Sequence, residues 1–113
     1  MNTMMKKYET FRDFYPYYLS EHHNRTCRVL HFAGSTIVLA ILVTMLITQQ
    51  WWLGWCIPLV GYGFAWVGHF YFEKNRPATF IYPVYSFSGD WVMYADLLLG
   101  KIGFTPRADE LRV

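Results

Sequence analysis

Two long uncharged apolar segments constrain what this chain can fold into. Residues 29–48 and 51–72 contain no Asp, Glu, Lys or Arg, and in the first segment only His31 ionises readily. A helix needs about 20 apolar residues to cross the hydrocarbon core of a bilayer, so each segment is long enough to be a membrane span. Two buried helices of a soluble protein would also be apolar, but a domain of 113 residues could hardly cover both on all sides. We therefore expect membrane insertion.

The short break between the segments predicts a helical hairpin. Only Gln49 and Gln50 separate them, so two antiparallel helices are expected over about residues 29–48 and 51–73. Small residues recur on one face of the second segment, which lets the first helix approach closely. These small residues are Gly54, Pro58, Gly61, Ala65 and Gly68.

The charges around the hairpin predict its orientation. The turn carries no Lys or Arg, whereas basic residues flank both open ends. They are Lys6, Lys7, Arg12, Arg25 and Arg28 before the hairpin, and Lys74 and Arg76 after it. By the positive-inside rule, both termini face the cytoplasm, and the Trp51, Trp52 and Trp55 row suits the opposite interface. We expect an integral protein of the bacterial inner membrane.

The segments outside the hairpin are too polar to span. Residues 8–21 mix aromatic and charged side chains around Pro16, and SFSGDWVMYADLLLG contains Asp90 and Asp96, for which we expect a solvated helix face. Each segment predicts a helix at the interface, one N-terminal and one C-terminal, although the second could also re-enter the membrane shallowly. The expected fold is an all-α integral membrane protein with a single domain over residues 1–113.

Charge and cysteine content exclude two classes of function. The net charge is only +2 and no polybasic arm is present, so nucleic-acid binding is not expected. Cys27 and Cys56 lie in different surroundings and form no metal or redox motif, so both are interpreted as free thiols.

The four histidines gather at the edges of the apolar segments. His31 lies about 18 residues before the turn and His69 about 19 residues after it. At 1.5 Å per residue, both stand roughly 28 Å from the turn on adjacent helices. The sequence therefore predicts that these two imidazoles are neighbours.

A third histidine can join them only if the chain bends. His22 precedes His31 by nine residues, which is half a turn out of phase on one continuous helix. Asn24 suits an N-cap, and a turn there would bring His22 or His23 back towards His31.

The second segment adds charged side chains near His69. Glu73 lies at i+4 and Arg76 at i+7 from His69, on one face of a helix that should end before Pro77. Neutral imidazole suits Fe, Zn, Cu and Ni, and histidines with a carboxylate and open positions suit non-haem Fe(II). The pattern predicts a metal site.

The stretches YYLSEHHNRTCRVLHFAGS and GYGFAWVGHFYFEKNRPATF resemble the family of the fungal protein named for metabolism of phytosphingosine to odd-numbered fatty acids. This chain is similar to a short bacterial-type member, over roughly residues 14–81. The shared pattern is His22-x-Asn24, His31, Gly68-His69, Phe72-Glu73 and Arg76-Pro77-Ala78.

The resemblance implies an Fe(II)-dependent dioxygenase at the cytoplasmic face of the membrane. Its substrates would be a long-chain 2-hydroxy fatty acid and O2, and its products the acid one carbon shorter, CO2 and water. His22, His31 and His69 would hold the iron, and His23 or Glu73 would complete or orient the shell. Arg76 would pair with the substrate carboxylate. The fungal and plant members are longer, so a homo-oligomer could complete the acyl-chain site.

Two other functions agree with parts of the pattern. A non-catalytic membrane protein that binds a metal or assembles with a larger partner would also explain the small size and the glycines. Another lipid-modifying oxidase, such as a hydroxylase, is disfavoured, because the usual eight-histidine motifs cannot be built from four histidines.

Overall fold

The computed structural model of the chain describes residues 8–77 and 80–107. All the regular secondary structure in these ranges is helical, which confirms the all-α expectation. The elements are α1 (Phe11–Ser20), α2 (Arg25–Thr48), η1 (Trp51–Trp55), α3 (Cys56–Trp66), η2 (Val67–Glu73) and α4 (Pro83–Leu98). Lys6, Lys7 and Ala78, and with them both chain ends, lie outside the described residues.

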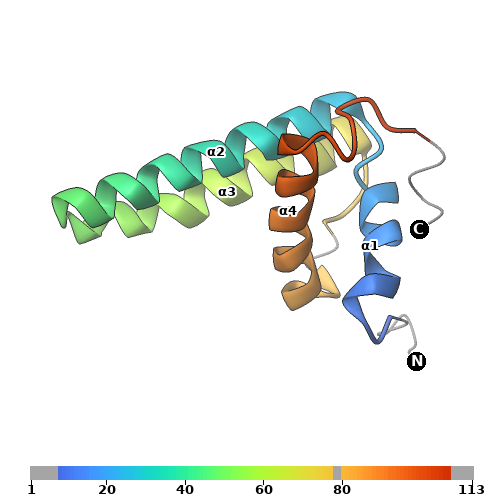
Figure 1. Cartoon of the computed structure of the whole chain (residues 1–113), viewed down its shortest axis with the longest axis horizontal. Helices are drawn as coiled ribbons and strands as arrows, with labels where there is room; N and C mark the ends of the chain where they lie inside the picture. Colours follow the sequence, from blue (N-terminus) through green and yellow to red (C-terminus); the bar gives the residue numbers. More distant parts are fainter. Residues whose placement is uncertain (1–7, 78–79, 108–113) are drawn as a thin grey trace.

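Helix α2 and the run from η1 to η2 lie side by side and antiparallel (Figure 1). The chain reverses at Gln49, whose left-handed φ of 57° ends α2 while its N–H donates to the Met45 carbonyl. At the other end, α2 begins at Arg25, four residues before the apolar segment, which confirms Asn24 as its predicted N-cap. The reason is Asn24, whose side chain accepts hydrogen bonds from the N–H groups of Thr26 and Cys27.

The second arm of the hairpin is divided into three kinds of helix. It starts as a 3-10 helix, continues as an α-helix with Pro58 in its first turn, and ends as a π-helix over Val67–Glu73. Each stretch is short, so α2 is the one helix among the described residues that is long and apolar enough to cross a membrane.

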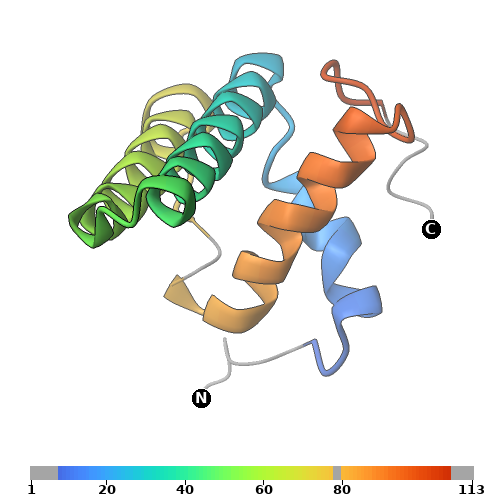
Figure 2. The ribbon, with the colours of Figure 1, turned by 60° about the vertical axis from the view of Figure 1, so that its left-hand side comes forward.

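Helices α1 and α4 pack against each other beside the open end of the hairpin and cross its axis steeply (Figures 1 and 2). Their shared core is mainly aromatic, and the Phe14 and Tyr82 ring centroids are 5.2 Å apart. The buried members are Phe14, Tyr18, Leu19, Tyr82, Met93 and Leu97. Gly89 permits this packing, because a Cβ there would lie 2.8 Å from the Tyr18 ring.

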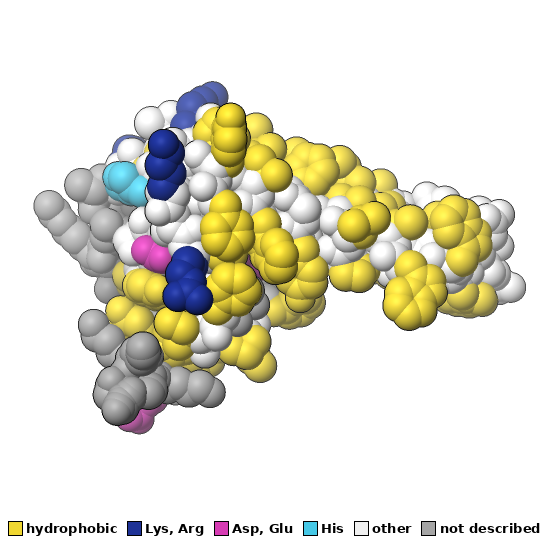
Figure 3. Space-filling model, turned by 180° about the vertical axis from the view of Figure 1, so that it is seen from behind, with side chains coloured by type: hydrophobic (Ala, Val, Ile, Leu, Met, Phe, Trp, Pro, Cys, Tyr) yellow, Lys and Arg dark blue, Asp and Glu magenta, His cyan; other side chains and the backbone are white. Residues whose placement is uncertain are grey.

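The remainder of the hairpin projects away from this core. We call residues 36–66 the stem and residues 8–35, 67–77 and 80–107 the head. The stem contains no Asp, Glu, Lys or Arg, and large apolar side chains cover it on the face shown in Figure 3. Ile47, Trp55 and Leu59 are 76%, 83% and 75% exposed. The charged side chains visible on that face gather at the head.

Candidate metal centre

Three histidines from three different elements meet in the head. His22 lies in the turn after α1, His31 in the second turn of α2, and His69 in η2. Their ring centroids are 4.4 Å apart for His22 and His31, 4.4 Å for His22 and His69, and 5.1 Å for His31 and His69. All three side chains are buried. The predicted adjacency of His31 and His69 is confirmed, and so is the bend that returns His22 towards them.

Each ring is held through its Nδ1 atom. Nδ1 of His22 lies 2.7 Å from the Tyr18 carbonyl oxygen, and Nδ1 of His31 lies 2.9 Å from the Cys27 carbonyl oxygen. Nδ1 of His69 lies 2.8 Å from Oδ1 of Asn75, whose amide nitrogen donates to the Glu21 carbonyl. These oxygens can only accept, so each Nδ1 carries the hydrogen. In the neutral rings, every Nε2 is therefore left with a lone pair.

The Nε2 atoms of His22 and His31 lie close together, an arrangement that suits a bound cation. Nε2 of His22 and Nε2 of His31 are 3.1 Å apart. A proton between them would require an imidazolium, and burial together with the neighbouring His31 and His69 rings lowers the pKa of His22 well below its usual value. A metal fits the separation, because two nitrogens bound at about 2.1 Å and at a right angle lie about 3 Å apart. The donor set therefore suits a divalent transition metal.

Cys27 belongs to the same cluster. The ligand atoms of His22, Cys27, His31 and His69 all lie within 4.8 Å of one another, and all four residues are buried. Both cysteines are free thiols, as expected, but Cys27 belongs to a group of side chains that could hold a metal ion, which the sequence interpretation did not foresee. The available signal was its spacing from His31, since residues four apart share one helix face.

Gly68 lets η2 approach the start of α2. A Cβ at Gly68 would lie 2.9 Å from Sγ and 3.4 Å from Cα of Cys27. Glycine is thus needed at this contact, and the contact brings the next residue, His69, to the cluster.

Glu73 links the end of η2 to the start of α2. Its carboxylate accepts a hydrogen bond from the backbone N–H of Asn24, the residue that caps α2. This contact places Glu73 next to the cluster rather than within it. An orienting role for Glu73 is compatible with this position and stays a prediction.

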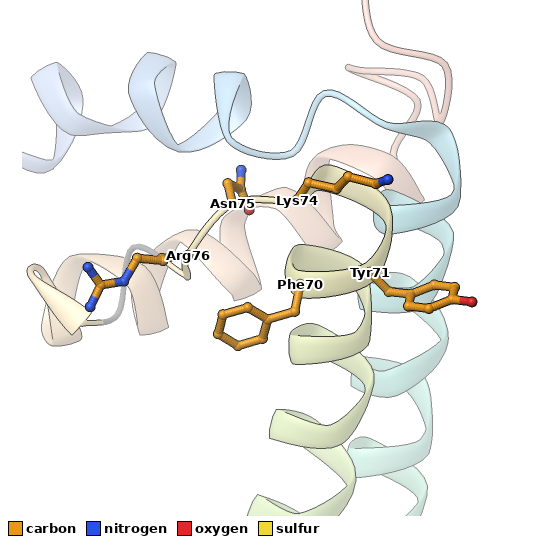
Figure 4. A pocket seen from close by; sticks show the side chains of 5 residues that line it. All are labelled: Phe70, Tyr71, Lys74, Asn75 and Arg76. Carbon is orange, nitrogen blue, oxygen red and sulfur yellow. The ribbon is translucent and has the colours of Figure 1, made fainter.

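His23 and Arg76 are not brought to the cluster. His23 is exposed. The second arm ends at Glu73, as the predicted range of residues 51–73 has it, because Lys74 adopts a left-handed φ of 59°. The prediction that Arg76 shares a helix face with His69 is therefore wrong. The Arg76 guanidinium lies 5.7 Å from the Phe80 ring centroid, and Figure 4 shows its side chain directed away from η2 beside a surface hollow.

Two residues of the head that were not predicted to support the site contact His22. The Tyr18 ring stacks on the His22 ring with centroids 4.1 Å apart. The fully buried Arg28 donates from Nε to the His22 carbonyl and from a terminal nitrogen to the Gly103 carbonyl, 2.7 and 2.8 Å away. In the sequence, Arg28 appeared only as one of the positive charges that orient the hairpin.

The acidic residues of α4 are not on a solvated face as expected. The Tyr18 hydroxyl donates to the Asp90 carboxylate, and burial raises the pKa of Asp90 to about 6. Asp96 accepts a hydrogen bond from the Tyr15 hydroxyl at 2.8 Å. Both carboxylates therefore connect α4 to α1, because the hydroxyls come from the α1 side of the shared core.

A cavity of about 420 Å³ adjoins the cluster and is lined by α2, α3 and α4. Its wall includes His31, Ser35 and Leu42 of α2, Ile57 and Gly61 of α3, and Asp90 of α4. One end of this cavity therefore opens at a ring of the candidate metal centre.

Comparison with known proteins assigns the chain to one family. No curated protein and no solved structure matches the chain significantly. The profile of the Mpo1-like family, described as 2-hydroxy-palmitic acid dioxygenase Mpo1-like, matches residues 8–102. That range holds His22, Cys27, His31 and His69 and covers most of the chain, so the protein belongs to the Mpo1-like family.

Proposed function

We propose that this protein is an Fe(II)-dependent dioxygenase that shortens long-chain 2-hydroxy fatty acids by one carbon. The observation that carries the proposal is the meeting of the three buried rings of His22, His31 and His69, each held through Nδ1 so that its Nε2 keeps a lone pair. The description of the family supports the substrate class.

The residues around the cluster would prepare it for the metal. The carbonyls of Tyr18 and Cys27 and the amide of Asn75 orient the three rings and raise their basicity. Iron bound by three histidines would supply the O2 chemistry, with further positions open to the substrate hydroxyl and carboxylate. Glu73 would hold η2 against α2 while the substrate binds.

The proposed reaction balances without another reductant. The C1–C2 bond of the 2-hydroxy acid breaks, C1 leaves as CO2, and C2 is oxidised to the new carboxyl group. O2 supplies one oxygen atom to that carboxyl group and one to water. The hydroxy acid provides all four electrons that O2 accepts.

We further propose that the stem lies in a bilayer and the head at its cytoplasmic surface, with both termini in the cytoplasm. Exposed apolar side chains such as Ile47 and Leu59 would cost little in lipid, and soluble monomers rarely carry so large an apolar surface. Helices α1 and α4, which cross the hairpin steeply, would then lie along the interface (Figure 1). A substrate could present its head group there while its tail stays in lipid.

Roles for Arg76 and His23 stay predictions. Arg76 is exposed and is absent from the wall of the cavity beside His31, so any pairing with the substrate carboxylate would occur during approach from the surface. Arg76→Gln should then raise KM and leave kcat unchanged.

Purified protein loaded with Fe(II) tests the reaction directly. Incubation with 2-hydroxypalmitate under O2 should yield pentadecanoate and CO2 in equal amounts, and His31→Ala should yield neither. If wild-type protein with bound iron forms no pentadecanoate, the proposed reaction is wrong.

A non-catalytic metal-binding protein is the second candidate, and Cys27 is the observation that favours it. Three histidines and one thiolate would close a tetrahedral site and leave no position for substrate, as in structural zinc centres. Cobalt-loaded protein should then show an intense near-ultraviolet thiolate charge-transfer band that Cys27→Ser removes. If that band persists when 2-hydroxypalmitate is added, the second candidate is favoured.

A further inference from the structure

The cavity beside His31 is elongated along the hairpin. His31, Ser35, Val38 and Leu42 line it from α2, and their spacings of four, three and four residues place them on one helix face. Eleven residues separate the first from the last, which corresponds to about 16 Å along the axis. On the antiparallel arm, Ile57 of α3 lines the wall. The cavity therefore runs from the head into the stem. It is partly open to the surface, since Phe87 in its wall is 66% exposed, and we call it the channel.

Three polar side chains of this channel lie at its head end, and Tyr62 lies further along beside Gly61. His31 and Asp90 stand at the head, and Ser35 follows one turn later on α2. Further along, the wall consists of apolar side chains that include Leu42 and Ile57. A ligand that matches this distribution has a polar head group next to the metal cluster and a single apolar tail directed into the stem.

We propose, building on the function proposed above, that this channel binds the acyl tail of the 2-hydroxy acid and measures its length. With the hydroxyl and carboxylate held at the cluster, each added carbon extends the tail from His31 towards Leu42 and Ile57. The side chains at that distal end set the longest tail that fits. Val38 and Gly61 lie part of the way along and set how wide the tail can be.

Gly61 offers a way to narrow the channel. A Cβ at Gly61 would lie 3.7 Å from Cγ2 of Val38, an ordinary contact, so a longer side chain would extend into the space that the tail occupies. Gly63 belongs to the same helix but does not line the channel, and a Cβ added there would meet no neighbouring group within 4 Å. Gly61→Leu and Gly63→Leu are therefore a matched pair.

Turnover of 2-hydroxyoctanoate, 2-hydroxydodecanoate and 2-hydroxypalmitate by these variants tests the proposal. Gly61→Leu should raise KM for 2-hydroxypalmitate by roughly 10-fold and leave KM for 2-hydroxyoctanoate unchanged. Gly63→Leu should behave as wild type. Leu42→Ala, which opens the distal end, should shift the preference towards longer acids. If Gly61→Leu changes KM equally at every chain length, the proposal is wrong. It is also wrong if neither Gly61→Leu nor Leu42→Ala changes the preference for chain length.

Equilibrium binding separates this inference from the proposed reaction. Octanoate and palmitate can be titrated into the same metal-loaded variants without O2. One outcome is that wild-type protein turns over no 2-hydroxy acid while Gly61→Leu selectively weakens palmitate binding. In that case the proposed reaction is wrong, and the proposal that the channel binds an acyl tail is supported. If Gly61→Leu displaces a co-purified phospholipid and leaves palmitate binding unchanged, the channel holds a structural lipid and the inference is wrong.

Discussion

The head and the stem of this protein differ in the kind of side chain that each buries and exposes. The head buries polar groups and gives each a partner: His22, His31 and His69 are held by oxygen acceptors, and Arg28 donates to two carbonyls. The stem exposes apolar groups, and only 17% of the most hydrophobic window of α2 is buried. A buried polar group is tolerated when its hydrogen bonds are satisfied, whereas a large exposed apolar surface marks a site of contact with another protein or with a membrane. The head therefore holds the candidate metal centre, and the exposed apolar surface of the stem supports the proposed placement in a bilayer.

The largest expected effect comes from removing one ligand of the head. His69→Ala should abolish stoichiometric metal binding and lower activity by more than about 100-fold, because the two remaining imidazoles no longer enclose an ion. His23→Ala is the control, since His23 is exposed and lies outside the cluster. Elemental analysis of protein purified without chelators measures both. Full metal content in His69→Ala would show that the ligand set is wrong.

A charge placed in the stem should have the next largest effect. Leu59 is 75% exposed, so Leu59→Lys would be nearly neutral in water but would cost about 2.5–3.5 kcal/mol near the centre of a bilayer. The fraction of protein that resists alkaline extraction from membranes should fall. Glu9→Lys, at an exposed position of the head, should leave that fraction unchanged. Equal extraction of the two variants would contradict a stem in the bilayer.

The junction of the two regions is sensitive to a single methyl group. Gly68→Ala would press against Cys27 and move His69, so we expect a loss of about 1–3 kcal/mol in the free energy of unfolding. Metal affinity should fall by about 10-fold. Gly63→Ala has open space around its Cβ and should slightly stabilise its helix. Thermal unfolding and metal titration in detergent distinguish them, and identical behaviour would refute a special role for the Gly68 contact.

The stability of the head should also depend on pH through a carboxyl group in its core. The pKa of Asp90 is about 6 in the folded chain against an ordinary 3.8, so the folded state holds this proton more tightly than the unfolded state. This contribution to stability is fully present below about pH 4 and is lost as the pH rises to about 6; it amounts to at most about 3 kcal/mol.

Asp90→Asn isolates this contribution. His22, with its lowered pKa, acts in the opposite sense, because the unfolded state binds its proton more tightly. Because His22 is present in both proteins, its effect cancels when the free energy of unfolding of Asp90→Asn is subtracted from that of the wild type. This difference should change between pH 4 and pH 6. A difference that stays constant over this range would assign the pH dependence to another group.

Much of the fold was accessible from residue types and spacing. The uncharged runs around Gln49 and Gln50 predicted the hairpin, and Asn24 predicted the start of α2 and the return of His22. Counting residues from the turn paired His31 with His69. These features depend on helical rise, on capping and on side-chain charge, all of which are local properties.

Other features depend on contacts between distant residues. Local spacing could not show that η2 would be a π-helix, or that the left-handed Lys74 after it would separate Arg76 from His69. Neither could it show that Tyr18 and Asp90 would meet across 72 residues.

By itself, the sequence determined an all-helical chain with an apolar hairpin, three histidines near one end and a family whose description names a 2-hydroxy acid. Only the tertiary structure decided which groups surround those histidines: Cys27 joins them, Arg28 and Tyr18 hold His22, and His23 and Arg76 lie outside. The physical reason is that a metal site needs lone pairs aimed at one point. Their direction is set by the Nδ1 hydrogen bonds and by the close approach at Gly68, which exist only once the helices have packed.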